Sequence, residues 1–132
     1  DMFTSIHHEY FLFYHQQTPI GWSFGRMENA ITYGMSNTGV LSQFQRRGIY
    51  SAFTRHMLAY IKELGYERVT SYHHLTNRAV LTAKLKLGFN IAGTMMSEEV
   101  GATVQLTYFF YPDTFQAFED ILGQLPDQTR TT

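Results

Sequence analysis

Gln45-Arg46-Arg47-Gly48-Ile49-Tyr50 is the stretch that decides the fold. It joins an apolar, strand-like run at residues 38–44 to an amphipathic helix pattern at residues 49–64. The first N–H groups of a helix have no partner within the helix, and the helix dipole adds partial positive charge there. Two arginines add full charges, and the glycine lets an anion approach the backbone. The stretch therefore predicts a phosphate-binding turn between a strand and a helix.

The composition indicates one folded domain. The 132 residues are 44% hydrophobic and 16% charged, which is typical of a chain that buries a core. The net charge of −1 predicts no general attraction to nucleic acid or to an acidic membrane. Because the chain has no cysteine, disulfides, thiolate catalysis and cysteine zinc sites are excluded. We expect a single domain over residues 1–125 and a polar tail over residues 126–132.

Location and assembly follow from weaker signals. No apolar run reaches the length of a membrane span, and no signal-peptide pattern opens the chain, so we expect a cytoplasmic protein. The 11 Phe, 9 Tyr and 1 Trp predict a ring-rich core or subunit interface, the alternative being an apolar substrate pocket. The aromatic run Tyr108–Tyr111 is consistent with a homodimer.

Patterning and turn residues predict the secondary structure on either side of the quoted turn. The apolar residues of the 49–64 helix recur at spacings of three and four, and Gly65 ends it. Thr18-Pro19 is expected to break the first strand from the second, and a bulge is expected near Gly34 or residues 37–39. The other predicted elements are strands at 9–16, 22–27, 30–44 and 67–73, a helix at 77–87, a hairpin of 89–96 with 103–111, and a short helix after Pro112-Asp113.

This order of elements predicts an α+β (mixed α/β) fold. Three successive strands form an antiparallel meander, and a strand–helix–strand crossover follows from Val40 to Val69. Such a crossover joins parallel strands and is right-handed, so the sheet is expected to be twisted and mixed. A second helix and a C-terminal hairpin complete the domain.

Two segments together resemble the GCN5-related N-acetyltransferase (GNAT) superfamily. Residues Val40 to Tyr50 are similar to that family's strand and pyrophosphate loop, Q/R-x-x-G-x-G/A. Asn77-Arg78-Ala79 through Leu87-Gly88-Phe89 is similar to its N-x-x-A…L-G-F segment. The resemblance covers roughly Ile20 to Tyr111. It implies a GNAT-like sheet, and it implies that the family's N-terminal strand and two helices are absent from this chain.

The resemblance also implies a co-substrate, acetyl-CoA or another acyl-CoA, held where the strand near Val40 splays from the strand near Tyr72. Backbone N–H groups around the turn would hold the pyrophosphate, and Leu41 and Ser42 would pair with the pantetheine amides by strand addition. Tyr50 stands where the family prefers glycine or alanine. The residues implied in binding are Val40, Leu41, Ser42, Gln45, Arg46, Arg47, Gly48, Ile49, Tyr50, Asn77 and Lys84.

Acyl transfer to an amine needs a base, donors for the oxyanion and a proton for the departing thiolate. Tyr72 and His74 share a face of the predicted strand. Histidine is a common general base in proteins, so His74 is our candidate base, with Tyr72 as a proton relay or as a residue that orients the acceptor. The alternative is that both residues only complete a strand. Lys84 stands where the family often has the tyrosine that protonates the thiolate. The sequence leaves three alternatives open for Lys84: a proton donor, a phosphate contact or a solvent-exposed helix lysine.

Other chemical motifs are weaker. Glu28 lies in a predicted turn and is expected to be a surface residue. The doublets His7-His8 and His73-His74 do not suit a metal, because neighbouring residues of a strand point to opposite faces. We therefore expect no metal site. The Walker pattern of a phosphate-binding loop is absent.

The sequence thus predicts an acyl-CoA-dependent N-acyltransferase. It would transfer acetyl from acetyl-CoA to the primary amine of a small molecule or peptide, by direct attack in a ternary complex. One alternative is an inactive module of the same fold that binds acyl-CoA or a protein. Another is a structural domain whose aromatic rings face a twin subunit.

Overall fold

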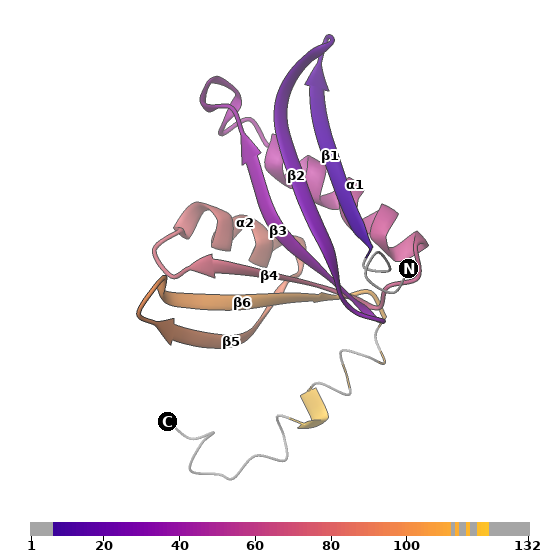
Figure 1. The fold of residues 1–132 in the computed structure, drawn as a ribbon, viewed down its shortest axis with the longest axis vertical. Helices are drawn as coiled ribbons and strands as arrows, with labels where there is room; N and C mark the ends of the chain where they lie inside the picture. The colour runs from indigo at the N-terminus through magenta and orange to yellow at the C-terminus, as the bar shows by residue number, and fades with distance from the viewer. Residues whose placement is uncertain (1–6, 112, 114–115, 117–118, 122–132) are drawn as a thin grey trace.

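The computed structural model describes residues 7–111, 113, 116 and 119–121 (Figure 1). Its six strands form one sheet in the order β1-β2-β3-β4-β6-β5. β3 and β4 are parallel, and the other neighbouring strands are antiparallel. The elements are β1 His8–His15, β2 Thr18–Asn29, β3 Thr32–Val40, α1 Ile49–Glu63, β4 Arg68–His74, α2 Arg78–Leu87, β5 Asn90–Ser97 and β6 Gly101–Phe109. The predicted mixed α+β fold is confirmed.

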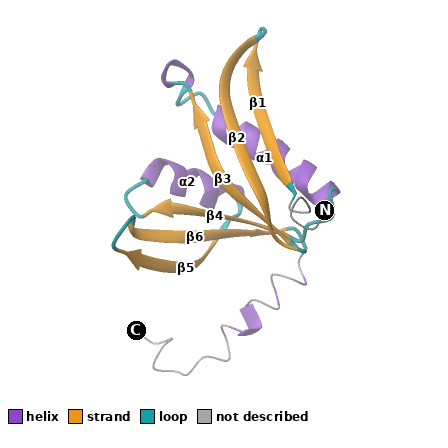
Figure 2. Ribbon diagram, viewed as in Figure 1, coloured by secondary structure: helices purple, strands orange, loops and turns teal. Residues whose placement is uncertain are grey.

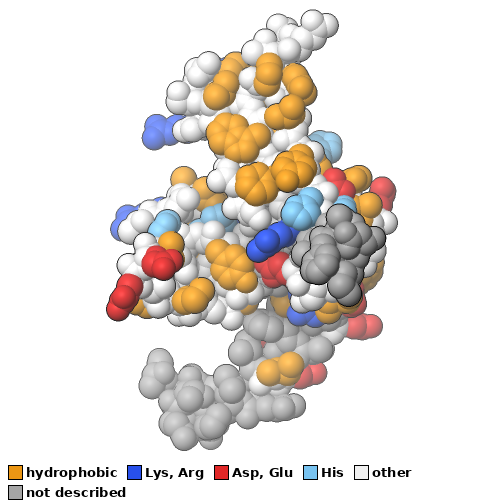
Figure 3. Space-filling view, in the orientation of Figure 1, with side chains coloured by type: hydrophobic (Ala, Val, Ile, Leu, Met, Phe, Trp, Pro, Cys, Tyr) orange, Lys and Arg blue, Asp and Glu red, His pale blue; other side chains and the backbone are white. Residues whose placement is uncertain are grey.

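Both helices lie on one face of the sheet (Figure 2). Since side chains alternate along a strand, Tyr33 and Met35 point toward the helices while Gly34 lies on the opposite face. We call this opposite face, which is turned to the viewer in Figures 1 to 3, the front face. The core fills the space between sheet and helices, and its buried members are Tyr33, Met35, Met57, Leu58, Ile61, Tyr66, Val69, Phe89, Val104 and Leu106.

β3 and β4 separate half-way along their length. Their pairing runs from Thr32 opposite Arg68 to Met35 opposite Ser71 and then stops. Beyond that point β3 stays paired with β2, β4 stays paired with β6, and the two diverge in a V with α2 in its opening (Figure 1). Ser36 is skipped in the register between β2 and β3, which places the expected bulge at the point of divergence. Since a bulge bends its strand, it helps to open the V.

The largest differences from the predicted strand bounds are at the start of β2 and at the end of β3. The first hairpin turns at Gln16 and Gln17, whose φ values of 49° and 74° suit a two-residue loop, and not at Thr18-Pro19. Proline is tolerated here because β2 begins with these residues, next to an irregularity in the register opposite Phe13 and Tyr14. β3 ends at Val40, because residues 42–44 wind into a 3-10 turn.

Glycine ends both helices as predicted. Gly65 after α1 and Gly88 after α2 adopt φ values of 103° and 109°, in the left-handed region that favours glycine. Most of the helix expected after residue 112, and the whole tail 126–132, lie outside the described residues. None of the described helices is long and apolar enough to cross a membrane.

The aromatic run Tyr108–Tyr111 starts in the last two residues of β6. β6 lies inside the sheet between β4 and β5. The Tyr108 ring packs against Phe89 and Phe110 at centroid distances of 5.4 and 5.6 Å. Tyr108 and Phe110 therefore pack against the core, whereas Tyr111 is 41% exposed, and the homodimer stays a prediction.

Candidate functional site

The turn between β3 and α1 presents free hydrogen-bond donors. Arg46 and Gly48 adopt left-handed φ values of 64° and 76°, and α1 starts directly after Gly48. Among the described residues, the backbone N–H groups of residues 46–51 meet no acceptor, and no acidic side chain lies in the first helical turn. Together with the helix dipole, these donors would suit an anion, and the phosphate-binding turn stays a prediction.

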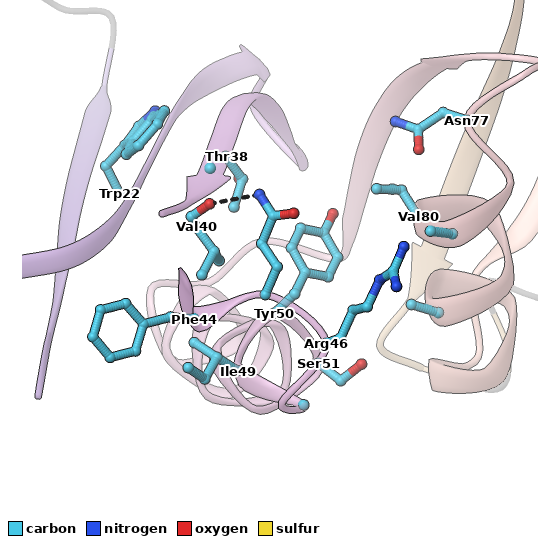
Figure 4. A pocket seen from close by; sticks show the side chains of 15 residues that line it. Trp22, Thr38, Val40, Phe44, Arg46, Ile49, Tyr50, Ser51, Asn77 and Val80 are labelled. Atoms are coloured by element: carbon cyan, nitrogen blue, oxygen red, sulfur yellow. Dashed lines mark hydrogen bonds between the residues drawn. The ribbon is translucent and has the colours of Figure 1, made fainter. Parts of the chain in front are cut away.

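The two arginines of the turn point in different directions. The Arg46 guanidinium lies across a cleft and is directed toward α2, as Figure 4 shows. The Arg47 guanidinium instead lies over the Phe44 ring, 5.5 Å from its centroid. Arg46 is therefore the one whose side chain lines the cleft.

The cleft has a volume of about 630 Å³ and lies between the end of β3, the turn and α2 (Figure 4). A smaller chamber of about 170 Å³ lies where β3 and β4 separate. Thr38, Tyr50, Asn77 and Val80 line both cavities, so the two adjoin. Asn77 precedes α2, and its side chain makes no capping hydrogen bond. A path of cavities thus leads from the anion site to the base of the V.

The backbone groups of β3 that face the cleft belong to residues before Leu41 and Ser42, the two residues predicted for strand addition. Leu41 N–H donates to Ile20 O, and the Leu41 and Ser42 carbonyls accept hydrogen bonds from within the 3-10 turn. These two residues are therefore not free for strand addition. In an antiparallel pair, backbone groups alternate between facing the partner strand and facing away. Because Leu41 faces β2, the backbone groups of Thr38 and Val40 point into the cleft.

Two side chains already occupy part of the cleft. Gln45 Nε2 donates a 2.9 Å hydrogen bond to Val40 O, as the dashed line in Figure 4 marks. The Tyr50 ring lies between β3 and α2, and burial raises the pKa of its hydroxyl. The strands are not closed against each other here, so the cleft persists, but Tyr50 narrows it.

Lys84 contradicts the interpretation as a solvent-exposed lysine. Its side chain is 0% exposed, and it lines the small chamber at the base of the V. Nζ lies 3.3 Å from Met35 Sδ, 3.2 Å from His73 Nε2 and 5.0 Å from the Phe89 ring centroid. No carboxylate among the described residues pairs with it. Burial lowers the pKa of Lys84 to about 7, which poises it to exchange a proton near neutral pH.

His73 is the partner of Lys84 and was missed as a site residue. It points toward the helices, where Nε2 lies 3.1 Å from Ser71 Oγ as well as 3.2 Å from Lys84 Nζ. Burial first, and the charge of Lys84 second, lower the pKa of His73 to about 4. His73 is therefore neutral at physiological pH and accepts a hydrogen bond from Lys84.

Tyr72 and His74 lie on the front face of β4, as their spacing predicted. Tyr72 is 47% exposed and His74 is exposed, and Tyr72 also lines the small chamber. Burial, followed by the negative charge of Glu28, raises the pKa of Tyr72. The split in the sheet thus has Lys84 and His73 on the helix side and Tyr72 and His74 on the front side.

Within each histidine doublet, the two neighbouring side chains point to opposite faces of the sheet. His7 Nδ1 lies 2.7 Å from Tyr66 Oη, and His7 Nε2 lies 2.7 Å from Glu9 Oε1. Within the described part of the chain, no group of three His, Asp or Glu side chains is arranged to hold a metal ion.

Comparisons with known proteins concern the fold. No protein-family model and no curated protein sequence matches this chain. Several solved structures superpose on it. The ribosomal-protein-S18-alanine N-acetyltransferase from Escherichia coli superposes with a TM-score of 0.70 at 15% identity, over 77% of this chain and 68% of that one. A GNAT family acetyltransferase from Elizabethkingia anophelis with acetyl-CoA bound superposes with a TM-score of 0.69 at 17% identity, over 78% of this chain and 76% of that one.

A Bacillus subtilis acetyltransferase in complex with CoA gives a TM-score of 0.71 at 14% identity, over 79% of this chain and 78% of that one. These likenesses show that the chain has the GNAT fold, as the two sequence segments predicted. It is the fold of acetyltransferases, including ones solved with CoA or acetyl-CoA bound.

Proposed function

We propose that the chain is an acyl-CoA-dependent N-acyltransferase that transfers acetyl from acetyl-CoA to a primary amine by direct attack in a ternary complex. The observation that carries this proposal is the continuous path from the free amides of the turn, along the cleft, to the split between β3 and β4. A long anionic donor with a reactive end fits such a path. Its diphosphate matches the helix start, and its thioester would reach the chamber beside Lys84.

Different residues of the cleft would bind different parts of the acyl-CoA donor. The backbone N–H groups of residues 46–51 and the Arg46 guanidinium offer donors to the diphosphate. The backbone of Thr38 and Val40 offers a strand edge to the pantetheine amides, with Gln45 displaced from Val40 O. Asn77 lines both cavities and offers its amide to the same arm.

When bound, acetyl-CoA supplies an acetyl group on a thioester. On the front face, His74 takes one proton from the acceptor ammonium, so that the amine nitrogen attacks the acetyl carbonyl carbon. Tyr72 orients the acceptor beside it. As the new C–N bond forms, the C–S bond breaks and the nitrogen gives up a second proton to the solvent.

On the helix side, Lys84 as an ammonium donates one proton to the departing thiolate, and His73 holds Lys84 in place. With a pKa of about 7 for Lys84 and about 8.5 for an ordinary thiol, this transfer is downhill. The proposed location is the cytoplasm, where acetyl-CoA is available to such an enzyme.

The second candidate is an inactive module of the same fold. The Tyr50 ring in the cleft and the Gln45 side chain on Val40 favour it, because both must make room for a donor. A thiol-release assay over a panel of primary amines separates the candidates. Release that depends on the amine supports the enzyme, whereas binding of coenzyme A without release supports the module.

The donor site itself is tested by calorimetry with coenzyme A. We expect the double variant Arg46→Ala, Arg47→Ala to raise the dissociation constant about tenfold or more, since each hydrogen bond to a charged group contributes about 1.5–3 kcal/mol. The control is Arg55→Ala, Lys86→Ala, which removes the same charge from a separate pocket that the turn does not line. Equal affinities of the two double variants would refute the assignment of the turn.

A further inference from the structure

A carboxylate lies across the front face beside the point where β3 and β4 separate. Glu28 stands in an irregularity of the β2–β3 register, between Met27 and Asn29. Irregularities of this kind re-aim a side chain. Glu28 crosses β3 at Gly34, where an added Cβ would collide with its carboxylate. The glycine at position 34 therefore keeps this path open.

Thr70 of β4 holds the far end of the Glu28 side chain. Thr70 Oγ1 donates a 2.8 Å hydrogen bond to Glu28 Oε1. Thr70 is buried, whereas Glu28 is exposed. No Lys or Arg among the described residues forms an ion pair with Glu28. The carboxylate is thus held in position by Thr70, belongs to an exposed residue and forms no ion pair among the described residues, although Arg26 pairs with Gly34 beside it.

This carboxylate adjoins the proposed reaction centre. Thr70 is one residue before the last β4 position that pairs with β3, and Tyr72 is the first residue beyond the split. The charge of Glu28 acts on Tyr72, since it contributes to the raised pKa of that tyrosine. Tyr72 in turn lines the chamber that contains Lys84. A group bound at Glu28 therefore lies next to the chamber, on the side opposite Lys84.

An aromatic surface lies further along the front face of β1 and β2, with Arg26 between it and Glu28. It surrounds a hollow of about 520 Å³, and Figure 3 shows apolar side chains gathered over this part of the face. Tyr10 and Phe24 stack at 5.8 Å, and Trp22 is fixed by a 2.8 Å hydrogen bond from Nε1 to Asn37 Oδ1. The exposed members of this surface are Tyr10, Leu12, Tyr14, Trp22 and Phe24. Trp22 also lines the larger cleft.

Resting on the proposed function, we propose that Glu28 binds the ammonium group of the acceptor and that the acceptor is a primary amine with an aromatic or apolar body. An ammonium is attracted both by a carboxylate and by the faces of aromatic rings. The body of such a molecule would cover Phe24 and Trp22, while its nitrogen lies between Glu28 and Tyr72. An anionic head group is repelled by Glu28, and an uncharged one gains at most a hydrogen bond without the charge attraction.

Binding of 2-phenylethylamine, with 2-phenylethanol as its uncharged counterpart, tests the proposal without relying on turnover. By titration calorimetry we expect the wild-type chain to bind the amine about tenfold more tightly than the alcohol. Glu28→Gln keeps an acceptor for Thr70 but removes the charge, and it should abolish this preference. Glu63→Gln, an exposed residue at the end of α1, should leave the preference intact. The proposal is overturned if the wild-type chain shows no preference or if Glu28→Gln retains it.

Kinetics supply a second readout. Glu28→Gln should raise the KM for the amine about tenfold and leave the KM for acetyl-CoA unchanged. A rise in both would indicate a structural defect and overturn the assignment to the acceptor. If the wild-type chain neither binds coenzyme A nor releases thiol, the proposed function fails, and the calorimetric comparison still decides the role of Glu28.

Discussion

Lys84 makes the stability of this chain depend on pH in an unusual direction. The side chain is fully buried without a carboxylate partner among the described residues, and its pKa falls from 10.5 to about 7. Below pH 7 Lys84 is charged in both the folded and the unfolded chain, and burying this charge raises the free energy of the folded state. Between pH 7 and 10.5 the unfolded chain binds more protons than the folded chain. The free energy of unfolding therefore rises with pH across this window.

The size of the effect follows from the lowered pKa. A change from 10.5 to about 7 corresponds to about 5 kcal/mol at low pH, because each pH unit is worth about 1.36 kcal/mol. Between pH 7 and pH 9 the same linkage predicts a gain of about 2 kcal/mol. Lys84→Met fills a similar volume beside Met35 and removes the titrating group. At pH 7 this variant should be more stable than wild type by about 2–4 kcal/mol, since replacing a buried charge by an apolar side chain is often stabilising.

Urea denaturation at several pH values between 6.5 and 9.5 measures this difference. The stability of wild type should approach that of Lys84→Met as the pH rises. His73 does not interfere, because its pKa of about 4 places its own contribution below this window. Parallel pH profiles for the two proteins would refute a buried, perturbed lysine. Loss of turnover in the same, more stable variant is expected if Lys84 supplies the proton for the thiolate.

Two further predictions concern the proposed catalytic base and the turn. His74→Ala should flatten the acidic limb of the pH–rate profile, and an unaltered limb would remove His74 as the base. Gly48→Ala and Gly65→Ala each place a methyl group in open space at a left-handed φ, so both should lose about 1 kcal/mol of stability. Only Gly48→Ala should weaken the binding of coenzyme A in calorimetry, since its methyl group stands where the diphosphate meets the backbone. Equal effects of the two substitutions on binding would argue against the turn as the site.

The elements that were predicted correctly are determined by the sequence of the segment itself. The helix after Gly48 follows from apolar spacing and from a glycine at each end. The order of strands and helices then restricts the topology to a mixed sheet with one crossover. The 3-10 turn after Val40 was missed, because residues 41–44 are apolar enough to read as a strand. Its hydrogen bonds, from Phe44 N–H to Leu41 O and from Gln45 N–H to Ser42 O, leave no pattern in the sequence.

The parts of the site that the sequence left open or missed depend on packing between distant parts of the chain. For Lys84 the sequence left open a proton donor, a phosphate contact or a solvent-exposed lysine, and lysine is rarely buried. Its spacing was the available signal, since Val80, Lys84 and Leu87 recur at four and three residues and share one face of α2. His73 becomes important only through its contact with Lys84. Glu28 depends on a register irregularity and on a glycine in the next strand, and neither is visible in the local sequence.

Two features that cost stability lie along the proposed path of the donor, although Gln16 and Gln17 also adopt left-handed φ values away from it, in the first hairpin. Where a left-handed residue only ends a helix, the chain uses glycine, at Gly65 and Gly88. In the turn that enters α1, Arg46 adopts this conformation without being glycine, at a cost of about 1 kcal/mol or more. Lys84 adds the larger cost of a buried, unpaired amine at the other end of the same path. A fold selected for stability alone would place glycine at position 46 and an apolar side chain at position 84, since both changes are single substitutions without a packing penalty. Both costly residues line the two adjoining cavities, which supports the proposal that these cavities serve a reaction.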